Sequence, residues 1–331
     1  PPLTFVPAMV GNATVDESNP AKDHGDMKTE ATALMCYSAR VQQAHKKLAR
    51  MLSATVDQDA YVALAEARLA GAKVRLSKEM DDAMLADGGR TAELVEEWRE
   101  RQTVDLERLL AEQRERRGKA ESKLAVKETK AALNDVRVAG NKIRQFEGKL
   151  ADLERTEPAS DDGRIWPGEY AAVVVQDRAR LVRPMRYQCR MPGWTPEIER
   201  KFSNSYNARR DALESSWKRL FGTRHAVMVV DRFYESVQRD GKAVELEFTP
   251  QTGEPMLVPC LWSYDERDDL YSFAAITDEP EPEVAAAGHD RTILNLRPEH
   301  IDAWLAGGSA SAMHALFDQK QRPYYEHRES Q

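Results

Sequence analysis

Apolar residues recur at helical spacing through a long central stretch of the chain. From about Asp59 to Arg155 the composition is dominated by Ala, Leu, Glu, Lys and Arg, which favour helices, and proline is absent. Gly88–Gly89 divides this stretch, and we expect a second break near Gly118. Its last apolar positions are spaced as in a heptad repeat. They are Val136, Ile143, Phe146, Leu150 and Leu153. The pattern predicts a helical hairpin or antiparallel coiled coil.

The pattern changes after a polar linker at residues 156–163. Short β-branched or aromatic runs, bounded by Gly, Pro or Asp, predict strands at 170–175, 225–230, 244–248 and 270–276. Asp240–Gly241 and Thr252–Gly253 are typical of hairpin turns. Helices are expected at 207–221 and 298–305. The sequence therefore predicts an α+β fold, with a mixed, mostly antiparallel β core, flanking helices and a long helical insertion near the N-terminus.

The first 34 residues have no sustained period and are rich in Pro, Gly and polar residues. We interpret them as a disordered tail or an upstream extension, since the chain does not begin with Met and shows no signal peptide. No apolar run reaches the ~20 residues that a membrane span needs. Three cysteines without a CxxC pair argue against a disulfide framework or a zinc ribbon. A reducing cytoplasmic compartment is expected.

Charge is distributed unevenly along the chain. The net charge of −7 taken alone argues against a nucleic-acid partner. Residues 178–224, however, carry twelve Lys or Arg against four acids, interleaved with aromatic side chains such as Trp194. Basic and aromatic residues together are typical of a groove for single-stranded DNA. In the helical stretch both signs alternate, and we interpret those charges as solvated helix faces.

Five short motifs occur in order along the chain. They are Met35-Cys36, Pro192-Gly193-Trp194, Asn207-Ala208-Arg209, Phe233-Tyr234-Glu235 and Gly288-His289-Asp290-Arg291. The set resembles the SRAP family, the SOS-response-associated peptidases that crosslink to abasic DNA. The resemblance covers residues 35–40 and about 166–305. It implies an SRAP-like domain built from residues 35–58 and 156–331, interrupted by a coiled-coil insertion at 59–155 and preceded by residues 1–34.

The resemblance implies a DNA-damage protein that caps abasic sites in single-stranded DNA. An N-terminal cysteine carries an α-amine, with a pKa near ~8, beside a thiol. The amine of Cys36 would form a Schiff base with the sugar aldehyde, and the thiol would close a thiazolidine ring. This chemistry requires Cys36 to be the first residue of the active protein. AP-lyase-like and thiol peptidase activities belong to the same expectation.

The family's motifs also imply roles for the other residues. Asn207 would position the adduct, Glu235 would orient or deprotonate the amine, and His289 would act as acid and base for sugar-ring opening. Five residues would contact DNA, as phosphate ligands or, for the tryptophan, by stacking on a base. They are Arg209, Arg291, Trp194, Arg210 and Arg186. No metal or other cofactor is expected, and the protein would be cytoplasmic and nucleoid-associated.

Other interpretations stay open. Asn207 could cap a helix, Trp194 could belong to the core, and Arg209 and Arg291 could form structural ion pairs with Asp211 and Asp290. A Cys–His thiol peptidase that removes its own N-terminal extension is a second function, compatible with the first. A third is an interaction protein without enzymatic activity, which binds a protein partner or itself through the helical insertion. Cys189 and Cys260 are expected to be inert.

Overall fold

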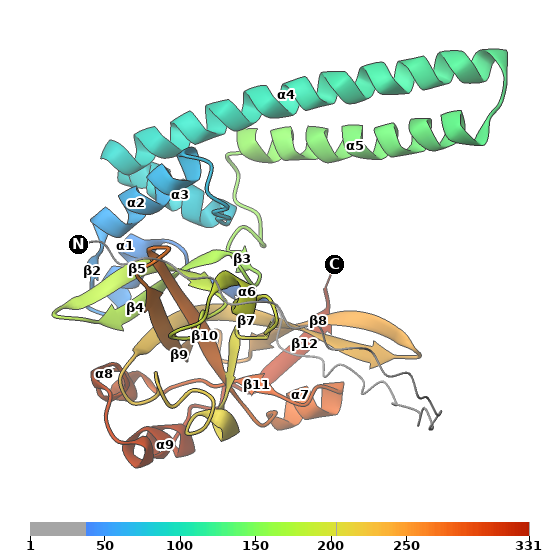
Figure 1. The fold of residues 1–331 in the computed structure, drawn as a ribbon. Coiled ribbons are helices and arrows are strands. Elements are labelled where there is room, and N and C mark those ends of the chain that lie inside the picture. Colours follow the sequence, from blue (N-terminus) through green and yellow to red (C-terminus); the bar gives the residue numbers. More distant parts are fainter. Residues whose placement is uncertain (1–37, 203, 331) are drawn as a thin grey trace, which may run out of the picture. The chain divides into compact units, whose positions relative to one another are not determined.

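Twelve strands form one sheet in the part of the chain that the computed structural model describes, residues 38–202 and 204–330 (Figure 1). The strands are β1 (Ser38–Val41), β2 (Thr55–Val56), β3 (Arg164–Ile165), β4 (Tyr170–Gln176), β5 (Arg180–Tyr187), β6 (Asn207–Arg209), β7 (His225–Arg239), β8 (Lys242–Pro250), β9 (Met256–Asp265), β10 (Leu270–Asp278), β11 (Thr292–Ile293) and β12 (Tyr325–Glu329). Most pairs are antiparallel; β2–β5, β5–β10 and β6–β10 are parallel. The predicted α+β fold with a mostly antiparallel sheet is confirmed.

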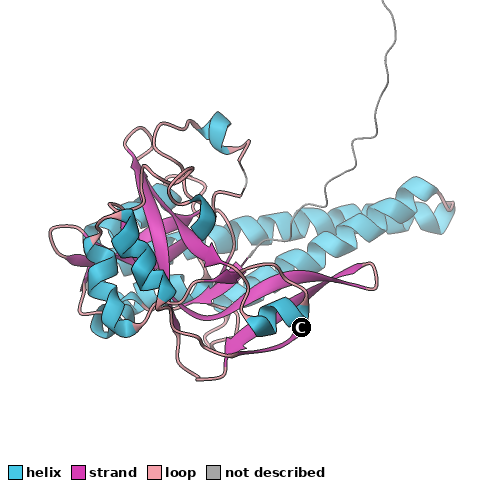
Figure 2. Cartoon of the chain, turned by 90° about the horizontal axis from the view of Figure 1, so that it is seen from below, coloured by secondary structure: helices cyan, strands magenta, loops and turns pink. Residues whose placement is uncertain are grey.

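Helices account for most of the remaining described chain (Figure 2). They are α1 (His45–Met51), α2 (Gln58–Leu69), α3 (Lys78–Asp87), α4 (Gly89–Val126), α5 (Lys130–Glu154), α6 (Pro196–Glu199), α7 (Pro282–Ala287), α8 (Ile301–Ala306) and α9 (Ala310–Asp318), with 3-10 turns η1 (Arg210–Ala212) and η2 (Pro298–His300). No helix within residues 38–202 and 204–330 is long and apolar enough to cross a membrane.

Five of the strands pair in a closed ring. β4 pairs with β5, β5 with β10, β10 with β9, β9 with β7, and β7 returns to β4. Successive side chains of a strand point to opposite faces, so β4 contributes to two separate cores. Val173 and Val175 pack in one apolar cluster, with residues of the same strands. Ala172 and Val174 belong to the other, which includes residues of α1, α2, α8 and α9. The ring therefore has a filled interior and an outer face covered by helices.

β7 extends beyond this ring and carries the chain toward the candidate site. Its first half pairs with β9, and its second half pairs with β1 and β8. The β7–β8 hairpin closes at Asp240–Gly241, where φ is +50° and +73°. Positive φ at both central residues defines the two-residue hairpin turn for which Asp-Gly is favoured. This predicted hairpin is confirmed, and its register places Glu235 opposite Leu246.

The central stretch forms the predicted helical hairpin, α4 and α5, which run side by side in both views (Figures 1 and 2). The helix break at Gly88–Gly89 is confirmed, because α3 ends at Asp87 and Gly88 has a φ of +71°. The break expected near Gly118 is wrong. Glycine costs about 1 kcal/mol inside a helix, and the packing of α4 against α5 outweighs that cost. The turn lies instead at residues 127–129, where the hydroxyl of Thr129 caps α5.

Two other predictions need correction. Residues 207–221 are not a helix: Asn207–Arg209 form β6, η1 follows, and consecutive turns bring Trp217 and Leu220 into the core. Pairing of β6 with β10 decides the conformation here, so Asn207 is not a helix cap. Thr252–Gly253 is a turn but does not close a hairpin, since β8 and β9 each pair with β7. The helix expected at 298–305 is confirmed as η2 and α8.

His225 is a buried histidine whose protonation should weaken the fold. Its ring stacks on Trp304 at 3.7 Å, its Nδ1 donates to the Trp304 carbonyl, and its Nε2 accepts from the Gly222 amide. Burial lowers the pKa of His225 to about 4. Below pH ~6.5 the unfolded chain binds a proton at His225 that the folded chain does not bind. The free energy of unfolding therefore decreases as the pH is lowered. Between pH 6.5 and 4, we expect His225 to lower the free energy of unfolding by at most about 1.4 kcal/mol for each pH unit.

The measurement is urea unfolding across that pH range, with His225→Gln as the non-titrating comparison. The variant should be less stable at pH 7 but lose stability less steeply on acidification. Parallel curves for the two proteins would show that His225 does not control the acid sensitivity.

Candidate functional site

Glu235 and His289 form a buried pair. Glu235 lies on β7, and its side chain is fully buried. His289 follows α7, where Gly288 ends the helix with a φ of +100°, a conformation that favours glycine. His289 Nε2 and Glu235 Oε2 are 3.1 Å apart, and neither side chain is exposed. The two residues come from motifs more than 50 positions apart, so the fold brings together two of the predicted site residues.

The distance between these atoms has a consequence for protonation. His289 Nδ1 lies 3.0 Å from the Arg291 carbonyl oxygen and 3.4 Å from the Arg291 backbone nitrogen, and these two contacts require opposite tautomers of the ring. In one tautomer Nε2 carries a hydrogen that it can donate, and in the other it has a lone pair that can accept one. Glu235 Oε2, 3.1 Å away, is within reach of either form. The pair can therefore exchange a proton between His289 Nε2 and Glu235 Oε2, which general acid–base chemistry requires.

The start of β1 lies beside this pair. Ser38, the first described residue of the segment, pairs with Tyr234, which directly precedes Glu235. Arg164 on β3 donates from Nε and Nη2 to the Ser38 hydroxyl at 3.0 and 2.8 Å. Its guanidinium lies 3.6 Å from the centre of the Tyr234 ring and also pairs with Glu245. Arg164 therefore fixes the position at which the chain enters the sheet next to Glu235.

Asn207 begins β6 and is buried. Its Oδ1 accepts a hydrogen bond from Tyr187 Oη at 3.3 Å, and β6 pairs with β10 so that Asn207 lies opposite Ala275. Tyr187 is itself packed against Tyr206 and Phe273. The carboxamide is therefore held at a defined place by a buried hydroxyl.

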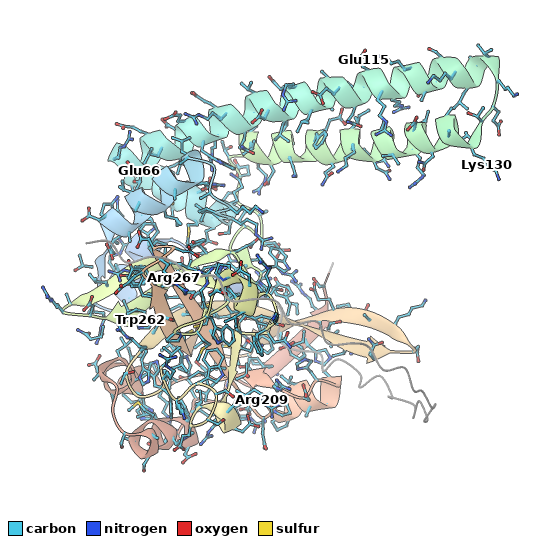
Figure 3. All side chains as sticks on the ribbon, in the orientation of Figure 1. Glu66, Glu115, Lys130, Arg209, Trp262 and Arg267 are labelled. Atoms are coloured by element: carbon cyan, nitrogen blue, oxygen red, sulfur yellow. The ribbon has the colours of Figure 1, made fainter. Side chains whose placement is uncertain are left out.

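Arg209, Arg210 and Arg291 line one cavity of about 680 Å³ next to the His289 loop. Arg209 forms a two-pronged ion pair with Asp211 at 2.8 and 2.5 Å, and this bond lowers the pKa of the Asp211 carboxyl. Arg291 is mostly buried and lies 3.5 Å from Asp290. Arg209 remains half exposed, with 48% of its side chain accessible (Figure 3). The cavity combines cations with acids rather than presenting cations alone.

Much of the charge expected to face DNA between residues 178 and 224 is neutralised. Among the described residues, seven of the twelve cations pair with carboxylates, most of them from outside the stretch. They are Arg180, Arg183, Arg186, Arg190, Arg200, Arg209 and Arg210. Arg186 binds Glu199 of α6. Trp194 stacks on Phe202 at 4.8 Å, and Phe202 is 53% exposed. This aromatic pair offers a ring face to solvent.

The remaining predicted catalytic residue, Cys36, lies outside the described residues. The two described cysteines are buried, and burial raises the pKa of the Cys189 thiol to about 12 and that of Cys260 further still. Neither forms a thiolate at neutral pH. Within residues 38–202 and 204–330, no cluster of three or more His, Cys, Asp or Glu is arranged to hold a metal ion.

Two residues of the site were missed from the sequence. Tyr187 contacts Asn207, and Arg164 anchors the start of β1. Tyr187 ends a strand five residues before Pro192, so a strand assignment at 180–187 could have drawn attention to it. Arg164 has no such signal, because its contacts with Ser38 and Glu245 join residues 126 and 81 positions apart.

The sequence profile of the SOS response associated peptidase (SRAP) family matches residues 123–329, more than half of the chain. The chain therefore belongs to the SRAP family. The match begins within α4 and includes α5, β7 and the His289 loop.

Among individual relatives, the chain is 29% identical over 146 residues to the abasic site processing protein YMR114C of Saccharomyces cerevisiae. This alignment covers 43% of the chain and 39% of the yeast protein, so the chain matches well under half of that relative's length. Two crystal structures each cover 51% of the chain with a TM-score of 0.44. One is a Bordetella bronchiseptica protein, 21% identical and 87% covered, and the other a Bacteroides thetaiotaomicron protein, 12% identical and 78% covered.

Proposed function

We propose that this protein captures abasic sites in single-stranded DNA through a covalent bond to Cys36. The single observation that carries the proposal is the buried Glu235–His289 pair at 3.1 Å beside the start of β1. Membership of the SRAP family and the likeness to a yeast abasic site processing protein support the choice of substrate. The protein would shield the damaged site from strand cleavage.

Cys36 precedes the start of β1 by a short distance along the chain. Only Tyr37 lies between Cys36 and Ser38 in the sequence, and two steps of extended chain span at most about 7 Å. Ser38 pairs with the neighbour of Glu235. In the proposed reaction the α-amine and thiol of Cys36 would reach that carboxylate over this short distance. Glu235 would accept a proton from the amine, and His289 would return a proton to the sugar oxygen when the ring opens.

The proposed reaction balances without a cofactor. The neutral amine attacks the aldehyde carbon of the opened sugar, and the carbinolamine loses water to give a C=N bond. The thiolate sulfur then bonds to the same carbon, the C=N π electrons move to nitrogen, and nitrogen gains a proton. The product is a thiazolidine ring, and a single proton passed between Glu235 and His289 serves both transfers. Asn207, held by Tyr187, would hydrogen-bond to the adduct.

The DNA strand would contact Arg209 and the Trp194–Phe202 pair. Arg209 is half exposed and can exchange Asp211 for a phosphate, and the exposed ring can stack on a base. Three less exposed cations, Arg210, Arg186 and Arg291, each pair with an acid. They would support phosphate binding from positions deeper than that of Arg209.

A covalent band in denaturing electrophoresis tests the proposal. The substrate is single-stranded DNA containing uracil, treated with uracil glycosylase to create one abasic site. A protein beginning at Cys36 should form a denaturation-resistant band, while Cys36→Ala and a chain that retains residues 1–35 should not, because the first lacks the thiol and the second has its amine blocked. Absence of the band from the protein beginning at Cys36 would reject abasic-site capture.

We propose autoproteolysis as a second, compatible activity, favoured by the family's description as a peptidase. The thiol of Cys36 would attack the carbonyl carbon of Met35, and the amine of Cys36 would depart with a proton from the His289–Glu235 pair, leaving a thioester between Met35 and the Cys36 sulfur. Water would then hydrolyse this thioester, releasing residues 1–35 with a free carboxyl group and restoring the thiol. Intact-mass measurement over time should record loss of residues 1–35 from the full chain, and Cys36→Ala should remain at full mass. Equal masses for both proteins would reject self-cleavage.

We also propose that residues 35–58 and 156–331 make one domain interrupted by residues 59–155. Pairing of β1 with both β7 and β3 across the interruption supports this division. In this arrangement the helical hairpin can serve a partner without entering the site.

Arg164 should act as a positioning residue for the capture reaction. Arg164→Ala removes both hydrogen bonds to Ser38 and lets the start of β1 move relative to Glu235. Misplacement by about 1 Å costs about a hundredfold in rate, so we expect the crosslinking rate to fall ten- to a hundredfold. Affinity for intact single-stranded DNA, measured by fluorescence anisotropy, should stay within about twofold. Ser38→Ala should reproduce part of the rate loss; an equal loss of affinity and rate in Arg164→Ala would contradict a positioning role.

A further inference from the structure

The distal part of the α4–α5 hairpin is basic in an acidic protein. Residues 114–149 contain eleven Lys or Arg and five Asp or Glu, a net charge of +6, whereas the whole chain carries −7. Figure 3 labels Glu115 within α4 and Lys130 at the start of α5; Lys130 lies next to the turn that joins the two helices. Positive and negative residues alternate along this part of the sequence. The sequence alone does not reveal which of the positive charges are neutralised by ion pairs in the fold.

The acids of this distal part form ion pairs mainly with cations of α4. Four ion pairs of 2.5–2.8 Å account for four of the five carboxylates. They are Arg114–Glu147, Arg116–Asp135, Arg117–Glu121 and Lys119–Glu115. Two of these pairs draw Asp135 and Glu147 of α5 toward α4. The cations of α5 are thereby left without carboxylate partners among the described residues.

The outward face of α5 carries a straight row of these cations. Lys130, Arg137 and Arg144 are exposed and seven residues apart, so they recur about every 10.5 Å on one side of the helix. The buried residues Ala132, Ala139 and Ile143 define the opposite side, which packs against α4. The row is therefore directed away from the hairpin's own core.

Neutral residues fill the places between the cations. Asn134, Asn141 and Gly148 belong to the same face by helical spacing. The two acids between residues 130 and 148, Asp135 and Glu147, pair with Arg116 and Arg114 of α4. Asn134 Oδ1 accepts from Arg137 at 2.9 Å, and Asn141 Oδ1 accepts from Arg144 at 2.6 Å. These bonds orient each guanidinium without compensating its charge. The result is an ordered, uncompensated cationic face about 21 Å long.

We infer that this face of α5 binds the sugar-phosphate backbone of duplex DNA, independently of sequence. Duplex DNA carries one negative charge per ~1.7 Å of its axis and is rigid, which suits a straight row of fixed cations. Lys, Asn and Arg are donors to phosphate oxygens. The face has no aromatic side chain, whereas binding of single strands relies on aromatic stacking, so the row does not suit unpaired bases. This contact would hold duplex that flanks damage, and it does not depend on Cys36.

The salt dependence of duplex binding tests this inference. The full chain is titrated with a fluorescent 30-base-pair duplex without abasic sites, from 50 to 200 mM NaCl. A triple variant, Lys130→Gln, Arg137→Gln and Arg144→Gln, should bind at least about tenfold more weakly at 50 mM salt. The slope of log K against log salt should become shallower by about 2.7, or 0.9 for each lost phosphate contact. Glutamine is a good helix former, and circular dichroism checks that the hairpin is intact.

A matched control removes the same charge from the same hairpin. Arg101, Arg108 and Arg117 are exposed on α4, and each pairs with a glutamate four residues away. Their triple change to glutamine should leave the slope and the affinity nearly unchanged. Equal effects of both triple variants, or no effect of the α5 variant, would overturn the inference. So would tight binding of the wild type to phosphatidylserine vesicles together with no binding to the duplex. Since the duplex is undamaged, failure here leaves the proposed capture by Cys36 unaffected, and the converse holds.

Discussion

Glu235→Gln should slow abasic-site capture by two to four orders of magnitude. The carboxylate lies 3.1 Å from His289 Nε2, and the amide keeps the shape of the side chain but cannot act as a base. Loss of a general base typically costs a factor of 10²–10⁴. The rate is measured under single-turnover conditions, with a protein that begins at Cys36 in excess over DNA carrying one abasic site.

The control is Glu326→Gln, which removes a carboxylate from an exposed position on β12. Its capture rate should equal that of the wild type. DNA affinity should be unchanged in both variants, because Glu235 is buried and faces no phosphate. A Glu235→Gln protein that is folded by circular dichroism and reacts within threefold of the wild-type rate would remove Glu235 from the proposed chemistry.

Arg190→Met should lower the free energy of unfolding by about 3–5 kcal/mol, the cost of breaking a buried ion network. Arg190 is 5% exposed, and its guanidinium binds Glu199, Asp265 and Asp268. Desolvation opposes these bonds, but the three carboxylates still raise the pKa of Arg190 further above its usual range. Removal of the cation leaves Glu199, which is almost fully buried, with Arg186 as its remaining partner. Urea unfolding measures the change.

Arg200→Met provides the comparison, because Arg200 belongs to the same basic stretch but is 71% exposed and pairs with the exposed Glu197. We expect its effect to stay within about 0.5 kcal/mol. Similar losses in the two variants would show that burial of Arg190 does not matter. The contrast distinguishes the cations of this stretch that support the fold from those that can face a ligand.

The hairpin and the longer strands could be predicted because their signals are local. The heptad spacing from Val136 to Leu153 and the Asp240–Gly241 turn each describe one contiguous segment, and both occur in the fold. Strand β6 could not be predicted, because Asn207–Arg209 are extended only through their pairing with residues of β10 that lie 68 positions later. Gly118 is a similar case: packing against α5 overrides an unfavourable residue, and a single segment does not reveal its partner.

The candidate site divides in the same way. The motif order pointed to Glu235 and His289, and the fold places them in contact. It did not point to Arg164 or Tyr187, whose importance arises from contacts with Ser38 and Asn207. The charge count was least informative, because Arg183 and Arg190 meet carboxylates that lie 75 or more positions away in the sequence. Net charge in a segment does not predict net charge on a surface.

The two halves of the proposed proton pair belong to parts of the protein that should open on different timescales. Glu235 lies on the long strand β7 and pairs with Leu246 of β8, so its amide should exchange with deuterium only in global unfolding. His289 lies in a short loop after a six-residue helix. Transient opening of that loop would withdraw the imidazole and admit water while the strand stays protected. Under mild heat or denaturant, the protein should therefore lose activity reversibly when the His289 loop opens, before strand β7 unfolds.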